Sequence, residues 1–376
     1  MDAFIAERSG PMAAHVLSEL EALVAVSSPS GDHAGAEAAV ALCIAFLPAE
    51  VRVERVPCST PNFSDDLLVR IAGRGDRRLL LLGHLDTVIS HDAHTPLRHE
   101  DGRLHGPGTA DMKGGVAVSL AVARALAERP ERYAELAVLL VCDEEWRTQP
   151  FHHVERFAGY DACLCFEAGE RTADGAEGVI VRRKGAGTLR VSAAGRAAHS
   201  GSAPRDGRSA LLALAQLAPR LAALGDPDGP ERLTVVPTIL RAGEALNVVP
   251  ASGELVLDLR SDEIGAFERV RRLVPEEIDG VGLGAGMERV WPAMDTEQAT
   301  AGLLAAASER LGRSIVPRSR GGASDASHFA AAIPLTVDGL GPRGGGAHTP
   351  GEFVHEASLG ERLEVALAVA LAALAC

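Results

Sequence analysis

The sequence predicts an α/β protein in which a mostly parallel sheet, flanked by helices, is interrupted by an inserted α+β domain. Over the first 180 or so residues, helical periodicity alternates with short apolar runs that are typical of buried strands. The stretch 185–291 breaks this alternation, and the chain after residue 291 returns to it. We therefore expect a main domain formed by residues 1–184 and 292–376, with residues 185–291 as a second domain.

The elements of the first part follow from the spacing of apolar residues. Helices are expected where apolar residues recur every three or four positions, at 12–26, 34–46 and 114–127. Strands are expected at the apolar runs 67–71, 78–82, 136–141 and 162–166. The run 78–82 is almost entirely apolar, which is typical of a strand that is buried on both faces.

The later part contains shorter elements separated by glycine and proline. Strands are expected at 179–193, 233–240, 253–260 and 334–338. Helices are expected at 209–224, at 267–273, after residue 291 and from residue 358. The run GVGLGAG from Gly280 has the glycine spacing of a dinucleotide-binding loop, but no long apolar strand precedes it, so we interpret it as a turn.

Composition excludes several classes of protein. The 376 residues, 47% of them hydrophobic, are enough for two domains with their own cores. A net charge of -14 would repel phosphate backbones, so no nucleic-acid partner is expected. The start of the chain lacks the apolar region of a secretory signal. The apolar stretch from Val365 is shorter than a membrane span, so we expect a buried helix there, no membrane partner and a cytoplasmic location.

The six cysteines are scattered and form no CxxC pair. Cys163 and Cys165 lie in the expected strand 162–166. We interpret the cysteines as reduced thiols of the core, with metal or redox use as the alternative.

Two residues that follow the apolar run 78–82 are candidates for a metal site. His84 and Asp86 are two positions apart, a spacing that places both side chains on one face of an extended chain. A metal-bound imidazole needs an acceptor for its second nitrogen, and Asp86 would supply one to His84. Ligands also collect at the carboxyl ends of strands in open α/β sheets. A surface turn is the alternative interpretation.

Further acidic residues lie at the ends of expected elements. Asp111 follows a Gly-Pro-Gly turn, where its carboxylate could bridge two metal ions or simply cap the next helix. Asp143, Glu144 and Glu145 end an apolar strand. Crowded carboxylates need compensating positive charge if they are buried, so we interpret one of them as a metal ligand and its neighbour as a proton carrier. A solvated loop is the alternative for this triplet.

Two more residues complete a candidate metal centre. Glu167 ends the apolar run 162–166, and His348 lies in a glycine-rich loop near the end of the chain. The candidate ligands are therefore His84, Asp111, Glu145, Glu167 and His348. Imidazole and carboxylate ligands without thiolates favour zinc, with cobalt or manganese as substitutes. One shared aspartate and two further ligands for each metal describe two ions about 3.5–4 Å apart.

These motifs resemble those of the co-catalytic zinc peptidase family, which includes glutamate carboxypeptidase, aminoacylase, acetylornithine deacetylase and succinyl-diaminopimelate desuccinylase. In chain order they are GHLDTV, GPGTADMKGG, DEE, FEAG and AHTPGE. GRAAHSG, ALNVVP and LDLR in the middle of the chain match as well, and so does GGASD near its end. The resemblance covers nearly the whole chain. It implies that residues 185–291 form a lid and dimerisation domain, with a four-stranded sheet and two helices.

The resemblance also implies how the metal ligands are divided. His84, Asp111 and Glu167 would hold one zinc ion. Asp111, Glu145 and His348 would hold the other, so that Asp111 bridges the pair.

Other roles implied by the resemblance fall on residues that hold no metal. Asp86 would orient His84, and Glu144 would be the general base. His199 would reach the active site of the partner subunit in a homodimer and stabilise the oxyanion. Asn247 and Arg260, with backbone amides of the glycine-rich loop near the chain end, would hold the substrate carboxylate.

The function implied is hydrolysis of a peptide or N-acyl bond in a small substrate that bears a carboxylate. A glutamate-carboxypeptidase-like activity and an N-acyl-amino-acid deacylase activity fit the motifs equally well. An aminopeptidase or dipeptidase is an alternative, and so is a catalytically inactive binding or regulatory protein on the same fold.

One segment departs from the family pattern. After Glu145 the family often has a small glycine-serine turn, whereas this chain reads WRTQPFHH over residues 146–153. We expect substrate access near Trp146 to differ, and His152 and His153 to face solvent, with ligand contact as the alternative. Three arginines are expected at the surface, with binding of an acidic group as the alternative: Arg318, Arg320 and Arg343.

Overall fold

The computed structural model describes residues 1–375, which divide into two compact units. Unit 1 comprises Met1–Arg182, Asp295–Ser319 and Ser324–Cys376. Unit 2 comprises Arg183–Met294 and Arg320–Ala323. The stretch 185–291, expected as an insert from its change of pattern, lies within unit 2.

Unit 1 is built on a six-stranded sheet with the strand order β1-β2-β6-β3-β7-β17. Its strands are β1 (Arg52–Val56), β2 (Asp66–Ala72), β3 (Arg78–His84), β6 (Glu135–Val141), β7 (Ala162–Cys165) and β17 (Leu335–Val337). β3 pairs in parallel with both β6 and β7, and β7 pairs in parallel with β17. β1 and β2 extend the sheet in antiparallel pairing. The carboxyl ends of β3, β6 and β7 therefore lie at one edge of the sheet.

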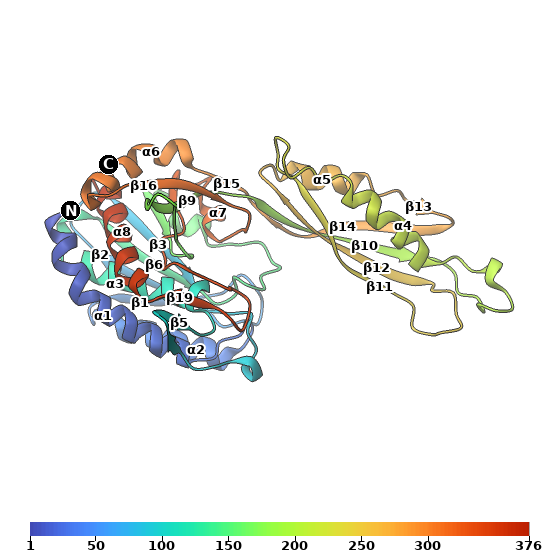
Figure 1. Ribbon diagram of the computed structural model, residues 1–376, viewed down its shortest axis with the longest axis horizontal. Coiled ribbons are helices and arrows are strands. Elements are labelled where there is room, and N and C mark those ends of the chain that lie inside the picture. The colour runs from blue at the N-terminus through green and yellow to red at the C-terminus, as the bar shows by residue number, and fades with distance from the viewer. Residues whose placement is uncertain (376) are drawn as a thin grey trace. The chain divides into compact units, whose positions relative to one another are not determined.

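Helices cover this sheet and bury its strands. The long helices of unit 1 are α1 (Ala3–Ala25), α2 (His33–Phe46), α3 (Gly114–Ala127), α6 (Glu297–Leu311) and α8 (Ala357–Ala373). Figure 1 shows α1, α3 and α8 lying side by side. Leu79 and Leu81 of β3 pack into the core that these helices form, while Leu80 and Leu82 point to the other face and are fully buried as well. A strand buried on both faces explains why β3 is apolar at every central position.

Two smaller sheets complete unit 1. One contains β8 (Glu170–Arg171), β9 (Glu177–Arg183), β15 (Met294–Asp295) and β16 (Ile315–Arg320). The other contains β4 (Arg98–Glu100), β5 (Arg103–His105), β18 (Gly344–Gly345) and β19 (Phe353–His355). β5 precedes the turn η2 (Thr109–Lys113), and β19 follows the loop that carries His348. Because β19 pairs with β5, segments more than 200 residues apart in sequence meet beside the main sheet.

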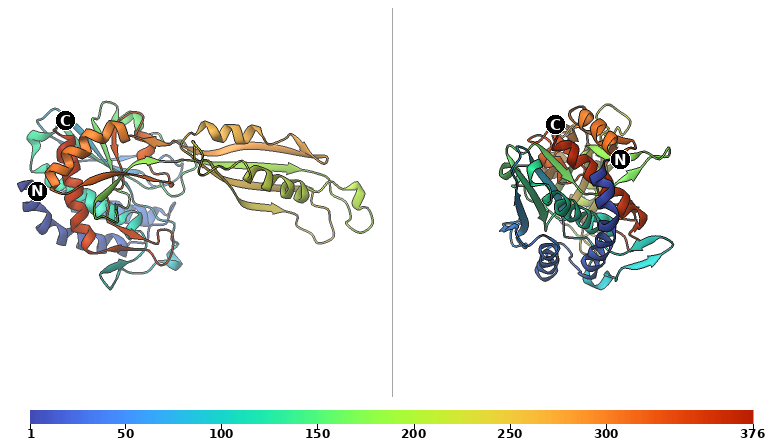
Figure 2. Two further views of the ribbon diagram at one scale, coloured as in Figure 1. Left: turned by 45° about the horizontal axis from the view of Figure 1, so that its top comes forward. Right: turned by 90° about the vertical axis from the view of Figure 1, so that its left-hand side faces the viewer.

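Unit 2 is a single antiparallel sheet with two helices on one face. Its strands, in the order β11-β12-β10-β14-β13, are β10 (Gly185–Ala194), β11 (Thr234–Ala242), β12 (Ser252–Ser261), β13 (Glu277–Ile278) and β14 (Val281–Trp291). Alternate residues such as Leu189, Leu257 and Leu259 form a core with α4 (Ala210–Ala222) and α5 (Gly265–Arg272). Figure 2 shows the long strands running beside both helices. β10, β11 and β12 fall where strands were expected from the sequence, and with β14 and the two-residue β13 the sheet has five strands where the resemblance implied four.

The structure corrects one turn prediction. The glycine run after Gly280 is the start of β14, an eleven-residue strand that pairs with β10 along its length. Its glycines alternate on the exposed side, while Leu283 and Ala285 between them pack against the core of unit 2. Tertiary pairing therefore overrides the low strand propensity of glycine. The true turn lies just before it, where Asp279 and Gly280 both have positive φ, as a two-residue hairpin requires.

Other elements differ in extent. α1 begins at Ala3 rather than residue 12, because Asp2 caps it through a 2.9 Å bond to Phe4 N and Pro11 is accommodated inside the helix. The expected strand 179–193 is two strands, β9 and β10, which belong to different units. β1 and β16 lie where no strand was expected. The short helix α7 (Ala326–Phe329) follows the GGASD motif.

The expected buried helix at the chain end is confirmed as far as the structure describes it. α8 extends to Ala373, and most of its side chains are fully buried. Along residues 1–375, no helix combines the length and the apolar character that crossing a membrane would require. Five cysteines are buried and free, in agreement with reduced core thiols, and Cys376 lies outside the described residues.

Candidate metal centre

All five predicted metal ligands meet at the carboxyl edge of the main sheet in unit 1. His84 is the last residue of β3, Glu145 follows β6, and Glu167 follows β7. Because these three strands run parallel, their ends lie together at one edge. Asp111 from η2 and His348 from the loop before β19 join them, since β5 and β19 pair beside this edge.

Asp111 lies between two imidazoles. Its Oδ1 is 3.0 Å from Nε2 of His84, and its Oδ2 is 3.1 Å from Nε2 of His348. Each carboxylate oxygen therefore faces one histidine. This arrangement suits a carboxylate that shares its two oxygens between two cations.

Two glutamates complete the cluster. Oε2 of Glu145 is 3.0 Å from Nε2 of His348, and Oε1 of Glu167 is 3.8 Å from Nε2 of His84. Ligand atoms of His84, Asp111 and Glu145 all lie within 4.8 Å of one another. The other carboxylate oxygen of Glu145, Oε1, is buried and has no hydrogen-bond partner. A buried carboxylate oxygen without a partner is costly, and a bound cation would satisfy it.

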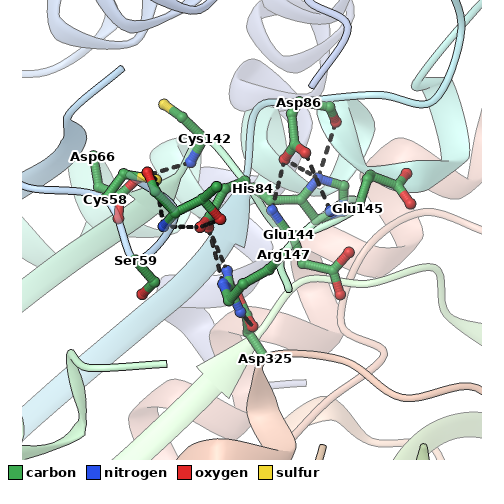
Figure 3. A network of polar contacts seen from close by, with 12 residues as sticks. Cys58, Ser59, Asp66, His84, Asp86, Cys142, Glu144, Glu145, Arg147 and Asp325 are labelled. Atoms are coloured by element: carbon green, nitrogen blue, oxygen red, sulfur yellow. Dashed lines mark hydrogen bonds and ion pairs between the residues drawn. The ribbon is translucent and has the colours of Figure 1, made fainter. Parts of the chain in front are cut away.

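Asp86 connects His84 to the Glu144–Glu145 turn (Figure 3). The Nδ1 atom of His84 is 3.0 Å from the backbone oxygen of Asp86 and 3.4 Å from its Oδ1. The Asp86 carboxylate also accepts the backbone N–H groups of Glu144 and Glu145, each at 3.1 Å. Ser30 donates to it at 2.5 Å. Asp86 therefore fixes both the imidazole and the turn that carries the candidate base.

Glu352 holds the turn that carries Asp111. Its Oε1 accepts the backbone N–H groups of Ala110 at 2.8 Å and Asp111 at 2.9 Å, and its Oε2 accepts that of Gly108 at 2.9 Å. Burial nevertheless raises the pKa of Glu352 to about 7, because it outweighs these three bonds. Since Glu352 lies four residues after His348, one short segment supplies a candidate ligand and fixes another.

The protonation behaviour of the cluster shows that it favours positive charge. Burial alone would lower the pKa of His84, but hydrogen bonds to Asp111 and Asp86 raise it well above its usual range. Hydrogen bonds to Asp111 and then to Glu145 raise the pKa of His348 to about 11. Burial would raise the pKa of Asp111, yet the bonds from His348 and His84 bring it below its usual value. The carboxylates therefore stabilise a cation at the position where the imidazole protons lie.

Glu144, the buried glutamate next to the ligand Glu145, is a candidate proton carrier and not a candidate ligand. Glu144 is only 9% exposed, and burial raises its pKa well above the usual range for a carboxylic acid. Burial also raises the pKa of Glu145. A carboxyl group with a raised pKa beside a cation site is suited to accept and return a proton near neutral pH.

The donor set fits metal ions. It offers imidazole nitrogens and carboxylate oxygens without thiolates, it favours positive charge, and it contains a buried oxygen without a partner. Zinc, and cobalt or manganese in its place, bind such sets. An open α/β sheet with this donor set at the carboxyl ends of its strands defines the class of metal-dependent hydrolases.

Comparison with known proteins places the chain within that class. The model of peptidase family M20/M25/M40 matches residues 80–372. Carboxypeptidase G2 of Pseudomonas sp. (strain RS-16) is 30% identical over 371 residues, which cover 93% of this chain and 87% of that protein. A succinyl-diaminopimelate desuccinylase of Stenotrophomonas maltophilia (strain R551-3) is 29% identical over 358 residues, covering 88% and 92%.

Solved structures share the fold. The YxeP protein of Bacillus subtilis, described as a dinuclear metal binding peptidase, matches with a TM-score of 0.72 and 15% identity over 97% of this chain and 99% of that one. The chain belongs to peptidase family M20/M25/M40 and is a metal-dependent hydrolase that acts on amide bonds.

The remaining predicted site residues lie in unit 2. His199 is exposed, and its Nδ1 accepts the backbone N–H groups of Gly201 at 3.1 Å and Ser202 at 3.2 Å. A neutral imidazole with this acceptor carries its proton on Nε2, where it can donate. Asn247 lies next to it, since its backbone oxygen accepts Ser200 N at 2.9 Å.

Arg260 is paired within its own strand. Its Nε donates to Oδ2 of Asp258 at 2.9 Å, two positions away on the same face of β12. A substrate carboxylate would have to compete with Asp258 for this guanidinium. The structure gives no contact that joins Arg260 to His199 or to Asn247.

One expectation for residues 146–153 was wrong. His152 is exposed, as expected, but His153 is fully buried and its Nε2 lies 2.8 Å from Oδ2 of Asp66. Burial lowers the pKa of His153 to about 4. Of the three arginines, Arg318 pairs with Glu170, and Arg343 pairs with Glu177 at 3.2 Å, so both are engaged by carboxylates of unit 1.

Several residues that shape the centre received no role from the sequence. Ser30 lies in a turn that reads only as a helix start, yet its hydroxyl binds Asp86. Glu352 was visible in the AHTPGE motif and Asp325 in GGASD, but a motif does not show which atoms a carboxylate contacts. Arg147 carried no signal, because a lone arginine after three acids is normally exposed.

Proposed function

We propose that this protein is a two-zinc amide hydrolase that cleaves a peptide or N-acyl bond in a small substrate bearing a carboxylate. The observation that carries the proposal is the placement of Asp111, whose two oxygens lie 3.0 and 3.1 Å from the imidazoles of two different histidines. His84, Asp111 and Glu167 would hold one ion, and Asp111, Glu145 and His348 would hold the other. The description of YxeP as a dinuclear metal binding peptidase supports the count of two.

The residues around the ligands divide the work of hydrolysis. A bound zinc pair would supply two kinds of chemistry there: a lower pKa for the attacking water and polarisation of the scissile carbonyl. Glu144 accepts the proton of that water and returns it to the leaving nitrogen, a role that its raised pKa favours. Asp86 keeps Glu144 in place through the backbone N–H of that residue, which it accepts at 3.1 Å.

Residues of unit 2 act on the substrate. His199, with its proton on Nε2, donates to the oxygen that becomes negative in the transition state. We assign this donation to the centre of the partner subunit in a homodimer. Asn247 and Arg260 contact the substrate carboxylate. When the substrate binds, Arg260 releases the Asp258 carboxylate and binds the substrate carboxylate in its place.

The homodimer forms through unit 2. β11 is the edge strand of its sheet and exposes Val236 and Leu240, while α4 exposes Leu212 and the loop after β11 exposes Leu246. An edge strand with apolar side chains is a template for pairing with a second copy. Burial of these side chains across a two-fold axis accounts for their exposure in a single chain.

The names of the relatives support two kinds of substrate. Carboxypeptidase G2 is named for release of a carboxy-terminal residue, and the desuccinylase for removal of a succinyl group. Both reactions break an amide bond close to a carboxylate. We therefore infer an N-acyl amino acid or a short peptide with a free carboxylate.

The experiment that tests the proposal compares Glu144→Gln with the wild-type enzyme, both loaded with zinc, on N-acyl amino acids and unmodified dipeptides. Glu144→Gln should retain two zinc ions per chain by elemental analysis and lose about 10²–10⁴-fold in kcat. Glu155→Gln, the same change at an exposed residue of the following segment, should behave as wild type. A protein that binds no zinc, or a Glu144→Gln variant with full turnover, would contradict the proposal. Cleavage only of substrates with a free amine would favour an aminopeptidase.

A further inference from the structure

Residues 146–153, which follow Glu145, supply no ligand to the candidate metal centre. Within this segment, Arg147 is fully buried, although its guanidinium carries a permanent charge. Such a group is stable inside a protein only when carboxylates surround it closely. Figure 3 shows its side chain beside that of Asp325.

Arg147 binds two buried aspartates at once. Its Nε and Nη2 donate to Oδ1 of Asp143 at 3.0 and 2.7 Å. Its Nη2 donates to Oδ2 of Asp325 at 3.0 Å, and its Nη1 donates to the other oxygen of Asp325. The pairing with Asp325 is therefore bidentate, the geometry for which arginine is better suited than lysine.

This ion network is covalently connected to the candidate base through the backbone. Asp143 is the residue directly before Glu144. Its second oxygen, Oδ2, accepts Thr60 N at 2.9 Å and Thr60 Oγ1 at 2.8 Å. Asp325 stands at the start of α7. Arg147 therefore ties the loop at Thr60, the end of β6 and the start of α7 to one point.

The turn that carries Glu144 and Glu145 is thus held from two sides. The Asp86 carboxylate accepts both of its backbone N–H groups at 3.1 Å. Asp143 and Arg147, which flank the two glutamates in sequence, are bound to each other. The turn therefore has anchors both on its backbone N–H groups and on the side chains at either end of it.

An alternative interpretation of the same region is an additional metal site. Ligand atoms of Cys58, Asp66 and Asp143 lie within 4.8 Å of one another, and all three residues are buried. However, Asp143 is already satisfied by Arg147 and Thr60, and Asp66 accepts Cys142 N at 2.8 Å while it lies 2.8 Å from His153 Nε2. Arg147 supplies the positive charge there, so the observations favour an ion network over a metal.

Phe151 of the same segment covers the network, together with rings of α7. The ring of Phe151 lies 4.6 Å from the guanidinium carbon of Arg147. The same ring stacks on His328 at 4.9 Å and meets Phe329 edge-on at 5.5 Å. Exclusion of water strengthens the ion pairs beneath the rings. Within residues 146–153, Arg147 therefore binds two buried carboxylates and Phe151 shields it from water.

We propose that Arg147 is a positioning residue that fixes the direction of Glu144 and Glu145. The inference rests on the proposed function, since it presumes that these two glutamates are the base and a ligand. Because Arg147 acts through them, its loss should lower kcat and zinc affinity and leave KM nearly unchanged.

The test uses two changes at the network and one control. Arg147→Lys keeps the charge but loses the planar fork. Arg147→Met combined with Asp143→Asn and Asp325→Asn removes all three charges at similar volume, which avoids unpaired buried aspartates. Arg156→Lys is the matched control, because Arg156 is an exposed arginine three residues beyond the segment. For each purified full-length variant, the measurements are kcat and KM on the folded fraction, and zinc affinity by competition with a chelator.

We expect Arg147→Lys and the triple variant to lose about 10–100-fold in kcat and in zinc affinity, with KM within about twofold of wild type. Arg156→Lys should match wild type in all three quantities. Unchanged kcat and zinc affinity in either network variant overturns the inference, and so does a rise in KM alone. If Glu144→Gln stays active, the proposed function fails; if it is inactive while Arg147→Lys is unchanged, only this inference fails.

Discussion

Gly115, the second residue of α3, allows that helix to approach the end of β7 closely enough for two ligands to meet. A Cβ atom at this position would lie 1.8 Å from the backbone oxygen of Phe166 and 2.9 Å from its carbonyl carbon. Both atoms belong to the main chain, so no rotamer change can relieve the overlap. Gly115→Ala therefore forces the start of α3 and the end of β7 apart by about 1 Å, a distance large enough to affect catalysis.

The size of the effect follows from this overlap. Overpacking of a filled core usually costs about 1–3 kcal/mol, and an overlap between two backbones lies at the upper end of that range. Gly115 lies four residues after Asp111, and Phe166 directly precedes Glu167. The same displacement should therefore separate two ligands and weaken zinc binding about tenfold or more.

Two measurements test this. Urea unfolding of the chelator-treated protein gives the free energy of unfolding, and titration of the folded protein with zinc gives its zinc affinity. Gly302→Ala is the control, because Gly302 lies inside α6 and an added Cβ would meet no atom within 4 Å apart from the neighbouring backbone of its own helix. Alanine there should stabilise by about 0.5–1 kcal/mol through its better helix propensity. The reasoning is refuted if Gly115→Ala unfolds at the urea concentration of wild type, or if it is destabilised with no change in zinc affinity.

Two further predictions concern pH and assembly. Because its carboxylate partners raise the pKa of His348 to about 11 in the metal-free protein, zinc must displace a proton from it at neutral pH. The apparent zinc affinity, measured by competition between pH 6 and 8, should therefore rise about tenfold per pH unit, and a flat profile would contradict this. Leu212, which is 63% exposed on α4, should support the dimer, so Leu212→Asp should sediment as a monomer where wild type sediments as a dimer. Wild-type protein that sediments as a monomer would end that proposal.

The fold could be predicted where apolar spacing is strong and local. α3 spans residues 114–127 as expected, and β3 and β6 lie within two residues of their expected ends. These elements are buried, so their pattern reflects their packing directly. β14 could not be predicted, because three of its first six residues are glycines and only pairing with β10 makes them a strand. Likewise, proline is over-represented at the first position of helices, whereas α1 continues through Pro11.

The sequence predicted the candidate metal ligands, but it did not predict the residues that hold those ligands in place. His84, Glu145 and Glu167 each follow an apolar run, and the parallel sheet places such positions together. Ser30, Arg147 and Glu352 gave no comparable signal. Their roles depend on contacts between segments as far apart as Gly108 and Glu352, which only the folded chain brings together.

The central claim is that Asp111 bridges two zinc ions, and anomalous scattering at the zinc edge from crystals of the zinc-loaded protein tests it most directly. Two peaks about 3.5–4 Å apart are expected, one on each side of the Asp111 carboxylate. His84 should contact one peak and His348 the other. A single peak, or two peaks with Asp111 bound to neither or only one, would show that Asp111 does not bridge two ions.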